Sequence, residues 1–402
     1  MEIRPILSAM WQNRTGSVLV ALQIALTLAI VVNCMFLAKN RIDFMSRPSG
    51  MDVDNIIFAQ SSGFGMDYNH NATVDADLRL ISEMPGVVSV ATTNQLPMSG
   101  SGNSTSFSAE FTDESPRHPA NTYTVNASII DTLGVELASG RGFRDEEIRL
   151  AGDPEINKMA SKVIITQELA DKLFDGEPAV GRLLYNGIGE AAEIVGVIKH
   201  MYGSWPSWQY VGQIALFPQR TDGPSTRYII RAEPDQRDAL IPMIEKQLAD
   251  SNRTRIVLDV EAMADRMKRT FEGENAVAVT LTVAVILLVA VTGLGIVGLA
   301  SFTVRQRTKQ IGTRRAIGAR KVDIIRYFLT ENWLMTTIGI VLGTVLTIAV
   351  NYSLASAFDT EKLDFRFLVA GMFMLWLLGF LAVADPARRA SKVSPAIATR
   401  TV

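Results

Sequence analysis

RQRTKQIGTRRAIGARKVDIIRYFLTE, residues 305–331, gives the first indication of how this chain is built. It holds eight Lys and Arg residues and only two acidic residues, Asp323 and Glu331. A long run without any charged side chain lies on each side of it. A short basic segment between two uncharged runs is typical of a cytoplasmic loop that joins two membrane-spanning helices.

Four uncharged runs are close to or longer than the length of a membrane-spanning helix, and the fourth is the shortest. A helix needs ~20 apolar residues to cross about 30 Å of hydrocarbon, because its backbone polar groups must be satisfied within the span. The sequence predicts such helices at residues 16–38, 276–304, 332–358 and 367–384. The first run exceeds the ~7 to 15 apolar residues of a signal peptide, so we interpret it as a retained anchor.

The distribution of Lys and Arg predicts the orientation. Short segments rich in these residues stay in the cytoplasm. The cytoplasmic segments are then expected at residues 1–15, 305–331 and 385–402. The other two segments are expected outside, at residues 39–275 and in the short loop 359–366, where three acids outnumber two bases.

The near-neutral chain divides into two parts of opposite charge. Residues 39–275 carry 23 basic and 34 acidic side chains, a net charge of −11, whereas the remaining residues carry a net charge of +9. The basic residues flank the spans, which favours anionic lipid or a cytoplasmic partner over nucleic acid. The only cysteine, Cys34, lies in the first span, so the outer segment must depend on its own hydrophobic core.

The outer segment contains two similar patterns. Residues 53–93 predict a strand, a helix with apolar spacing and a second strand, and residues 225–260 repeat that order. We expect one large α+β domain built from these two β-α-β units, with right-handed crossovers if their strands are parallel. Residues at about 122–220 are expected to form an inserted subdomain.

Within the insertion, four aromatic residues lie close together: Tyr202, Trp205, Trp208 and Tyr210. Two interpretations stay open. An exposed aromatic cluster can bind a partner or a ligand. Alternatively, aromatic residues beside prolines fill a small core.

Motifs for catalysis or metal binding are absent from the sequence. The three histidines are far apart, and none has the spacing of a zinc site. The acidic run at residues 145–147 could bind a cation, although the start of a solvated helix is the simpler interpretation. The 402 residues contain no G-x-x-x-x-G-K-[ST] motif, so we expect another chain to bind and hydrolyse ATP.

Four stretches together carry a family likeness. They are residues 305–331, LGVELASGRGF at 133–143, KVIITQELADKLFDGEPAVGRLL at 162–184 and PARRASKVSPAIATR at 386–400. The chain resembles the permease subunits of the MacB and FtsX class of ABC transporters. The likeness covers nearly the whole chain and implies four spans with a large extracytoplasmic domain between the first two.

The likeness also implies a coupling helix that docks in a groove of the ATPase subunit. The implied contact residues are Gly312, Arg314, Arg315, Ala316, Ile317, Gly318, Ala319, Arg320 and Asp323. In this segment Ile311, Ala316 and Ile317 offer apolar side chains, and the arginines can pair with carboxylates. The alternative is a basic loop whose side chains reach toward lipid head groups. We favour coupling, because lipid contact does not require the I-G and I-G-A spacing.

Helix packing and length suggest how motion would travel. Small residues that permit close helix packing are Gly293, Gly295, Gly298, Gly339 and Gly343. The second span is expected to continue the amphipathic helix before it as a stalk of about 40 residues, roughly 60 Å long. The stalk would carry motion from the ATPase to the outer domain.

MacB carries its nucleotide-binding domain ahead of the first span, whereas fourteen residues precede the first uncharged run here. We therefore expect a stand-alone permease of the bacterial inner membrane, without a cofactor of its own. Its expected partners are an ATPase that binds ATP and Mg²⁺, a second permease copy (identical or different), a periplasmic adaptor and an outer-membrane channel. Efflux or extraction of a periplasmic substrate is the favoured function. The alternative is an FtsX-like sensor or activator of cell-wall enzymes.

Overall fold

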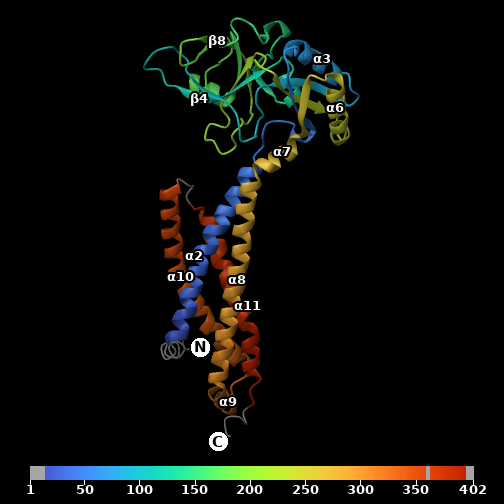
Figure 1. The fold of residues 1–402 in the computed structure, drawn as a ribbon. Coiled ribbons are helices and arrows are strands. Elements are labelled where there is room, and N and C mark those ends of the chain that lie inside the picture. The colour runs from blue at the N-terminus through green and yellow to red at the C-terminus, as the bar shows by residue number, and fades with distance from the viewer. Residues whose placement is uncertain (1–13, 359–362, 395–402) are drawn as a thin grey trace. The chain divides into compact units, whose positions relative to one another are not determined.

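The computed structural model describes residues 14–358 and 363–394 (Figure 1). Most of the expected N-terminal segment 1–15, half of the loop 359–366 and the end of the tail 385–402 lie outside the described residues. The chain forms two compact units. We call Met1–Ser46 with Gly273–Val402 the helical unit, and Arg47–Glu272 the α/β domain.

The helical unit contains the four spans that the sequence predicts. In the described part of the chain, four helices are long and apolar enough to cross a membrane. They are α2 (Arg14–Met45), α8 (Glu272–Gln306), α10 (Lys321–Phe358) and α11 (Phe365–Ser391). A short helix, α9 (Thr308–Ala316), follows α8 and contains much of the basic segment.

Helix α2 is the most enclosed of the four spans. Over its apolar window 56% of the residues are buried, against 17% for α8. Gly339 and Gly343 of α10 lie against it, and a Cβ atom added at Gly339 would come within 2.8 Å of the Cβ atom of Ile24. The hydroxyls of Thr27 and Thr292 join α2 to α8 through a 2.7 Å hydrogen bond. The small residues of α10 therefore bring two helices of the same chain together.

The three glycines of α8 differ in their surroundings. A Cβ atom at Gly293 would lie 3.2 Å from a methyl group of Leu378 in α11, and one at Gly295 would lie 2.7 Å from Gln23 of α2. Nothing lies within 4 Å of the corresponding position at Gly298. Gly298 is thus the one position among these three with open space beside it.

The two predicted β-α-β units of the α/β domain interlock. The first contains β1 (Ile56–Gly63), α3 (His70–Ser82) and β2 (Val87–Thr93), and the second contains β10 (Ser225–Ala232), α6 (Arg237–Ser251) and β11 (Arg255–Ala262). The strand order is β11-β1-β10-β2, and all neighbouring pairs are antiparallel. The strands within each unit are parallel, but a strand of the other unit separates them, as in a split β-α-β fold.

Alternating side chains of β1 show how this sheet is buried on both faces. Ile56 and Phe58 belong to one hydrophobic cluster, together with Ile229 of β10. Ile57 and Ala59 belong to a second cluster, which α3 and α6 cover. Successive side chains of a strand point to opposite faces, so each strand contributes to two cores.

The insertion continues the same sheet beyond β2 through one residue pair, Thr93 with Val125. The sheet order from there is β4-β9-β6-β8-β5, with β3 beside β4 and β7 beside β8. Its elements are β3 (Ser104–Phe107), β4 (His118–Val125), α4 (Ile129–Leu133), β5 (Leu137–Gly140), η2 (Asp145–Glu147), β6 (Lys162–Thr166), α5 (Gln167–Phe174), β7 (Leu183–Tyr185), β8 (Ala191–Ile198) and β9 (Ile214–Pro218). The remaining elements of the domain are η1 (Val53–Asn55) and α7 (Met263–Thr270).

The expected continuous stalk of about 40 residues is wrong, because the helix is interrupted. Helix α7 ends at Thr270, and Phe271 caps it with its backbone N–H directed at the Met267 and Lys268 carbonyls. The ring of Phe271 is buried. Helix α8 starts anew at Glu272 and contains 35 residues, about 52 Å at 1.5 Å per residue. The boundary between the two helices thus falls at the buried Phe271, which apolar spacing alone did not indicate.

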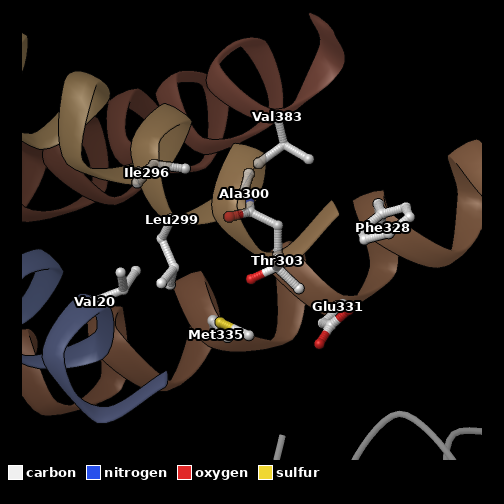
Figure 2. Close-up of a pocket in the computed structure, with 10 residues that line it drawn as sticks. Val20, Ile296, Leu299, Ala300, Thr303, Phe328, Glu331, Met335 and Val383 are labelled. Carbon is white, nitrogen blue, oxygen red and sulfur yellow. The ribbon is translucent and has the colours of Figure 1, made fainter. Parts of the chain in front are cut away.

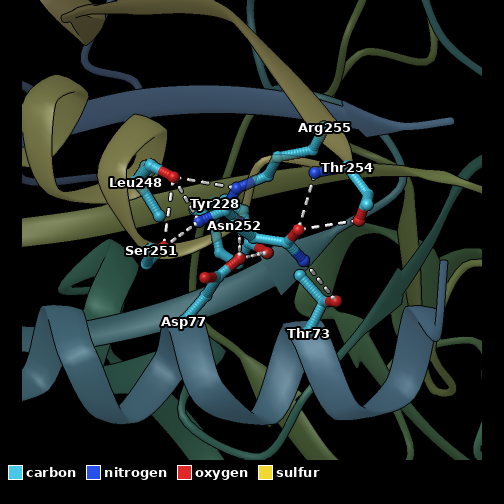
Figure 3. Close-up of polar contacts among 8 residues, drawn as sticks. All are labelled: Thr73, Asp77, Tyr228, Leu248, Ser251, Asn252, Thr254 and Arg255. Atoms are coloured by element: carbon cyan, nitrogen blue, oxygen red, sulfur yellow. Dashed lines mark hydrogen bonds and ion pairs between the residues drawn. The ribbon is translucent and has the colours of Figure 1, made fainter. Parts of the chain in front are cut away.

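A buried ion pair joins α3 to β11 (Figure 3). Asp77 accepts a hydrogen bond from the Arg255 guanidinium and another, 2.5 Å long, from the Tyr228 hydroxyl. Arg255 also donates to the Leu248 carbonyl and to the Ser251 hydroxyl. Burial and the neighbouring Asp77 carboxylate raise the pKa of the Tyr228 hydroxyl well above its usual value. The network fixes α3 and α6 against the sheet.

Arg255→Met is expected to destabilise the α/β domain by about 3 to 5 kcal/mol, because it leaves the Asp77 carboxylate buried without its cation. Tyr228→Phe removes a single hydrogen bond to the same carboxylate and should cost about 1.5 to 3 kcal/mol. The urea midpoint of the full chain in detergent, followed by tryptophan fluorescence, measures both. Equal midpoints for wild type and Arg255→Met would show that the pair does not stabilise the domain.

The acidic run at residues 145–147 forms the 3₁₀ helix η2. Two guanidinium nitrogens of Arg141 donate to the two carboxylate oxygens of Glu147, at 2.9 and 2.6 Å, and the Arg144 backbone N–H donates to Glu147 as well. These contacts lower the pKa of Glu147 to about 2. No group of three or more possible ligands for a metal ion occurs among the described residues. Glu147 therefore has a structural role that fits the helix-start interpretation.

The lowered pKa of Glu147 predicts a pH dependence of stability. A carboxylate whose pKa falls on folding stabilises the folded state above its unfolded pKa, about 4.3. This contribution is lost as the pH drops from about 5 toward about 2. Glu147→Gln should flatten that part of the profile of unfolding free energy against pH, and Glu146→Gln serves as the control. Parallel wild-type and Glu147→Gln profiles would contradict the assignment.

Candidate functional site

The basic segment forms a helical hairpin in the helical unit. Helix α9 ends at Ala316, Ile317 is its C-cap, and Gly318 follows with φ of +105°. The backbone N–H of Gly318 donates to the Arg315 carbonyl at 3.2 Å, and that of Ala319 donates to the Arg314 carbonyl at 3.0 Å. This is a Schellman motif, in which glycine supplies the positive φ without strain. The I-G-A spacing is therefore explained by the way α9 ends.

The hairpin is fixed on its other side by Asp323. Helix α10 starts at Lys321, and the Asp323 carboxylate accepts the Arg320 backbone N–H at 3.0 Å. This bond satisfies one of the donors that every helix N-terminus leaves unpaired. Asp323, expected among the partner contacts, thus has a local role as a helix cap.

Exposure divides the predicted contact residues into two groups. The side chain of Ile317 is 83% exposed at the tip of the turn. Ile311 and Gly312 are buried, and Ile311 packs in one cluster with Ala387 and Ala390 of α11. The expectation that Ile311 and Gly312 contact a partner is wrong, because both residues are buried within the helical unit. The exposed members of the segment are Arg314, Ala316, Ile317, Gly318, Arg320 and Asp323, whereas Arg315 and Ala319 are partly buried.

Two of the arginines have partners within the hairpin. The Arg314 guanidinium lies over the Tyr327 ring, 4.9 Å from its centroid. Arg315 donates to the Ala319 carbonyl at 3.3 Å. A charge placed at position 315 would therefore disturb the turn itself as well as any contact with a partner.

A buried ion pair that the sequence did not indicate closes the base of the hairpin. One guanidinium nitrogen of Arg307 lies 3.0 Å from each carboxylate oxygen of Glu331 and 3.3 Å from the Tyr327 hydroxyl. The side chains of Arg307 and Glu331 are 17% and 5% exposed. One feature of the sequence could have indicated this pair: a basic and an acidic residue lie near the two ends of the basic segment. A hairpin of two helices brings such ends together.

Beside this pair lies a small cavity between α2, α8, α10 and α11 (Figure 2). Its volume is about 40 Å³, enough for a water-sized molecule. Val20, Ile296 and Val383 contribute apolar walls, and Glu331 and Thr303 contribute polar groups. The ion pair thus borders a place where the four helices are not closely packed.

Comparison with known proteins agrees with this architecture. The family model of the MacB-like periplasmic core domain matches residues 17–266, and that of the FtsX-like permease C-terminal region matches residues 282–395. The chain belongs to the MacB and FtsX-like permease family. The match includes the α/β domain, the last three spans and the hairpin.

Similar sequences are the macrolide export ATP-binding/permease proteins MacB of several bacteria. That of Chromobacterium violaceum is 24% identical over 96% of this chain, and that of Neisseria meningitidis is 25% identical over 96%. The chain spans 58% of the length of each of these relatives.

Among solved structures, the periplasmic region of MacB from Actinobacillus actinomycetemcomitans is 14% identical, with a TM-score of 0.35 over 57% of this chain and 98% of that one. The extracellular domain of the transporter YknZ from Gram-positive bacteria is 16% identical, with a TM-score of 0.32 over 50% of this chain and 100% of that one.

Proposed function

We propose that this chain is a permease subunit that receives motion from an ABC ATPase through the hairpin and transmits it to the α/β domain. The observation that carries the proposal is the exposed Ile317 on a turn that the hydrogen bonds of the Schellman motif define. Val322 is also exposed, and the exposed basic residues Arg314, Arg320 and Lys321 lie within four positions of Ile317 along the chain. An exposed apolar side chain with basic residues close by is complementary to an apolar groove with acidic residues at its rim.

The hairpin has contacts that would carry a displacement into the spans. Ile311 packs against α11, and the Arg307–Glu331 pair joins the start of α9 to α10. The Schellman turn fixes Ile317 relative to both helices. A force on Ile317 would therefore move α9, α10 and α11 together. A basic loop that only contacts lipid has no need for an exposed isoleucine at its tip or for a buried ion pair at its base.

The proposal includes an orientation and an assembly. The hairpin and both termini lie in the cytoplasm of a bacterial cell, and the α/β domain lies outside the inner membrane, as the positions of Lys and Arg favour. The ATPase binds ATP and Mg²⁺. A second permease copy packs beside α8, which is the least enclosed of the four spans. The function is efflux or extraction of a periplasmic substrate, with a periplasmic adaptor and an outer-membrane channel as further partners.

Co-purification tests the contact directly. Ile317→Glu places a carboxylate at the apolar tip and should abolish recovery of the ATPase with the affinity-tagged chain from native membranes. Gln310→Glu introduces the same charge at an exposed site on α9 and should leave recovery unchanged. If Ile317→Glu recovers as much ATPase as wild type, the hairpin tip is not the docking site. Recovery of a cell-wall hydrolase in place of an adaptor would favour the activator function.

A further inference from the structure

An aromatic loop, residues 200–211 between β8 and β9, has no role in the function proposed above. Trp205 and Trp208 are in edge-to-face contact, with ring centroids 5.4 Å apart, and Trp208 contacts Tyr210 in the same way at 5.2 Å. All three side chains are partly exposed. The two indole rings pack on each other and do not join the hydrophobic clusters of the α/β domain. They therefore form a separate aromatic ridge.

Backbone hydrogen bonds and close contacts place this loop beside the segments through which the chain enters and leaves the α/β domain. The Tyr202 backbone N–H donates to the Ser49 carbonyl at 3.0 Å. The Gly100 backbone N–H donates to the Ser204 carbonyl at 2.8 Å, and a Cβ atom at Gly100 would lie 3.6 Å from Thr270. Ser49 follows the last residue of α2 by four positions, and Thr270 precedes the first residue of α8 by two. The loop thus occupies the end of the domain from which the chain enters the membrane spans.

Two segments at this end of the domain carry no ionisable carboxylate or strong base, whereas α7 at the same end carries Asp265, Arg266, Lys268 and Arg269. Residues 200–219 contain no Asp, Glu, Lys or Arg, and neither do residues 85–109, which include the neighbouring loop of Gly100. The segment 39–275 as a whole carries a net charge of −11. A surface of this kind avoids repulsion by anionic lipid head groups, in contrast to the rest of the domain.

We propose that the aromatic ridge lies in the lipid–water interface of the leaflet from which α2 emerges toward the domain. Tryptophan and tyrosine favour this region because the ring bodies are apolar while the indole N–H and phenol O–H can bond to head groups. The ridge would provide a third point of attachment besides α2 and α8, and a pivot about which the domain tilts. The proposal does not depend on the presence of an ATPase.

Depth-dependent quenching of fluorescence tests the proposal. The full chain with Trp11→Phe, Trp333→Phe and Trp376→Phe retains Trp205 and Trp208 as its only tryptophans. It is reconstituted in vesicles of phosphatidylethanolamine and phosphatidylglycerol that contain lipids brominated either near the glycerol or near the chain ends. Lipids brominated near the glycerol should quench most of the emission, and lipids brominated at the chain ends should quench less.

A matched control places one tryptophan at the other end of the domain. Met66 is fully exposed and lies beyond the end of β1, a strand about 26 Å long that starts near the attachment points. Met66→Trp, in a chain with all five native tryptophans replaced by Phe, should not be quenched by either lipid. If the Trp205 and Trp208 emission is as insensitive to brominated lipid as this control, the proposal is wrong. A loss of solvent exposure of Trp205 and Trp208 that appears only after a partner protein is added would equally contradict the proposal. That result would assign the ridge to the partner protein.

Discussion

Gly339→Val is expected to disrupt the packing of α10 against α2 in the helical unit. A Cβ atom at Gly339 would lie 2.8 Å from the Cβ atom of Ile24 and 2.9 Å from the backbone oxygen of Ala21. Neither group can move away without displacing α2. Overpacking in a core costs about 1 to 3 kcal/mol, and contact with backbone places this change at or above the upper end, about 3 kcal/mol. Titration of the full chain with dodecyl sulfate, followed by circular dichroism, measures the loss.

Gly298→Val is the matched control. It is the same substitution in a span, and a Cβ atom at Gly298 would have no neighbouring heavy atom within 4 Å. Its dodecyl sulfate midpoint should remain close to that of wild type. Equal shifts for the two variants would mean that α10 does not pack on α2 through Gly339.

Arg307→Leu is expected to lower the free energy of unfolding by about 3 to 5 kcal/mol, since it leaves the Glu331 carboxylate buried without a cation. The loss should be accompanied by release of α9 from α10, because this pair closes the base of the hairpin. Protease cleavage within residues 305–320 should then become faster, whereas cleavage in the α/β domain should not change. The two rates can be compared in the same digestion by mass spectrometry.

The double variant with Arg307→Leu and Glu331→Leu separates the charge from the packing. Replacing both partners of a buried pair by apolar side chains is often neutral, so stability should recover in large part. If Arg307→Leu lowers the free energy of unfolding by less than about 1 kcal/mol, the pair behaves like the solvent-exposed salt bridges that contribute little to stability.

The spans and the two β-α-β units could be predicted because each has a local signal. Membrane helices are set by run length, and strands and helices by apolar spacing. The interlocking of the two units could not be predicted. Strand order depends on the pairing of β1 with β10 and β11, about 170 to 200 residues away, and no local pattern encodes it. The break at Phe271 also escaped prediction, because neither glycine nor proline marks that position in the sequence.

In the hairpin, too, the burial of single residues could not be predicted from the local sequence. Ile311 and Ile317 both precede a glycine and are equivalent in the sequence. Ile311 lies within α9 and packs against α11, whereas Ile317 follows the helix and is exposed. Only the position of the helix end distinguishes them. The Arg307–Glu331 pair was hidden because its partners are 24 positions apart and meet only once the hairpin has formed.

ATP turnover of the reconstituted complex tests most directly whether the hairpin tip couples an ATPase to this chain. Wild type, Ile317→Glu and the control Gln310→Glu are each incorporated into lipid nanodiscs with the ATPase subunit. We predict that wild type and Gln310→Glu alter the ATPase rate relative to the isolated ATPase, and that Ile317→Glu leaves it at the isolated rate. Turnover by the Ile317→Glu complex equal to that of wild type would contradict the account.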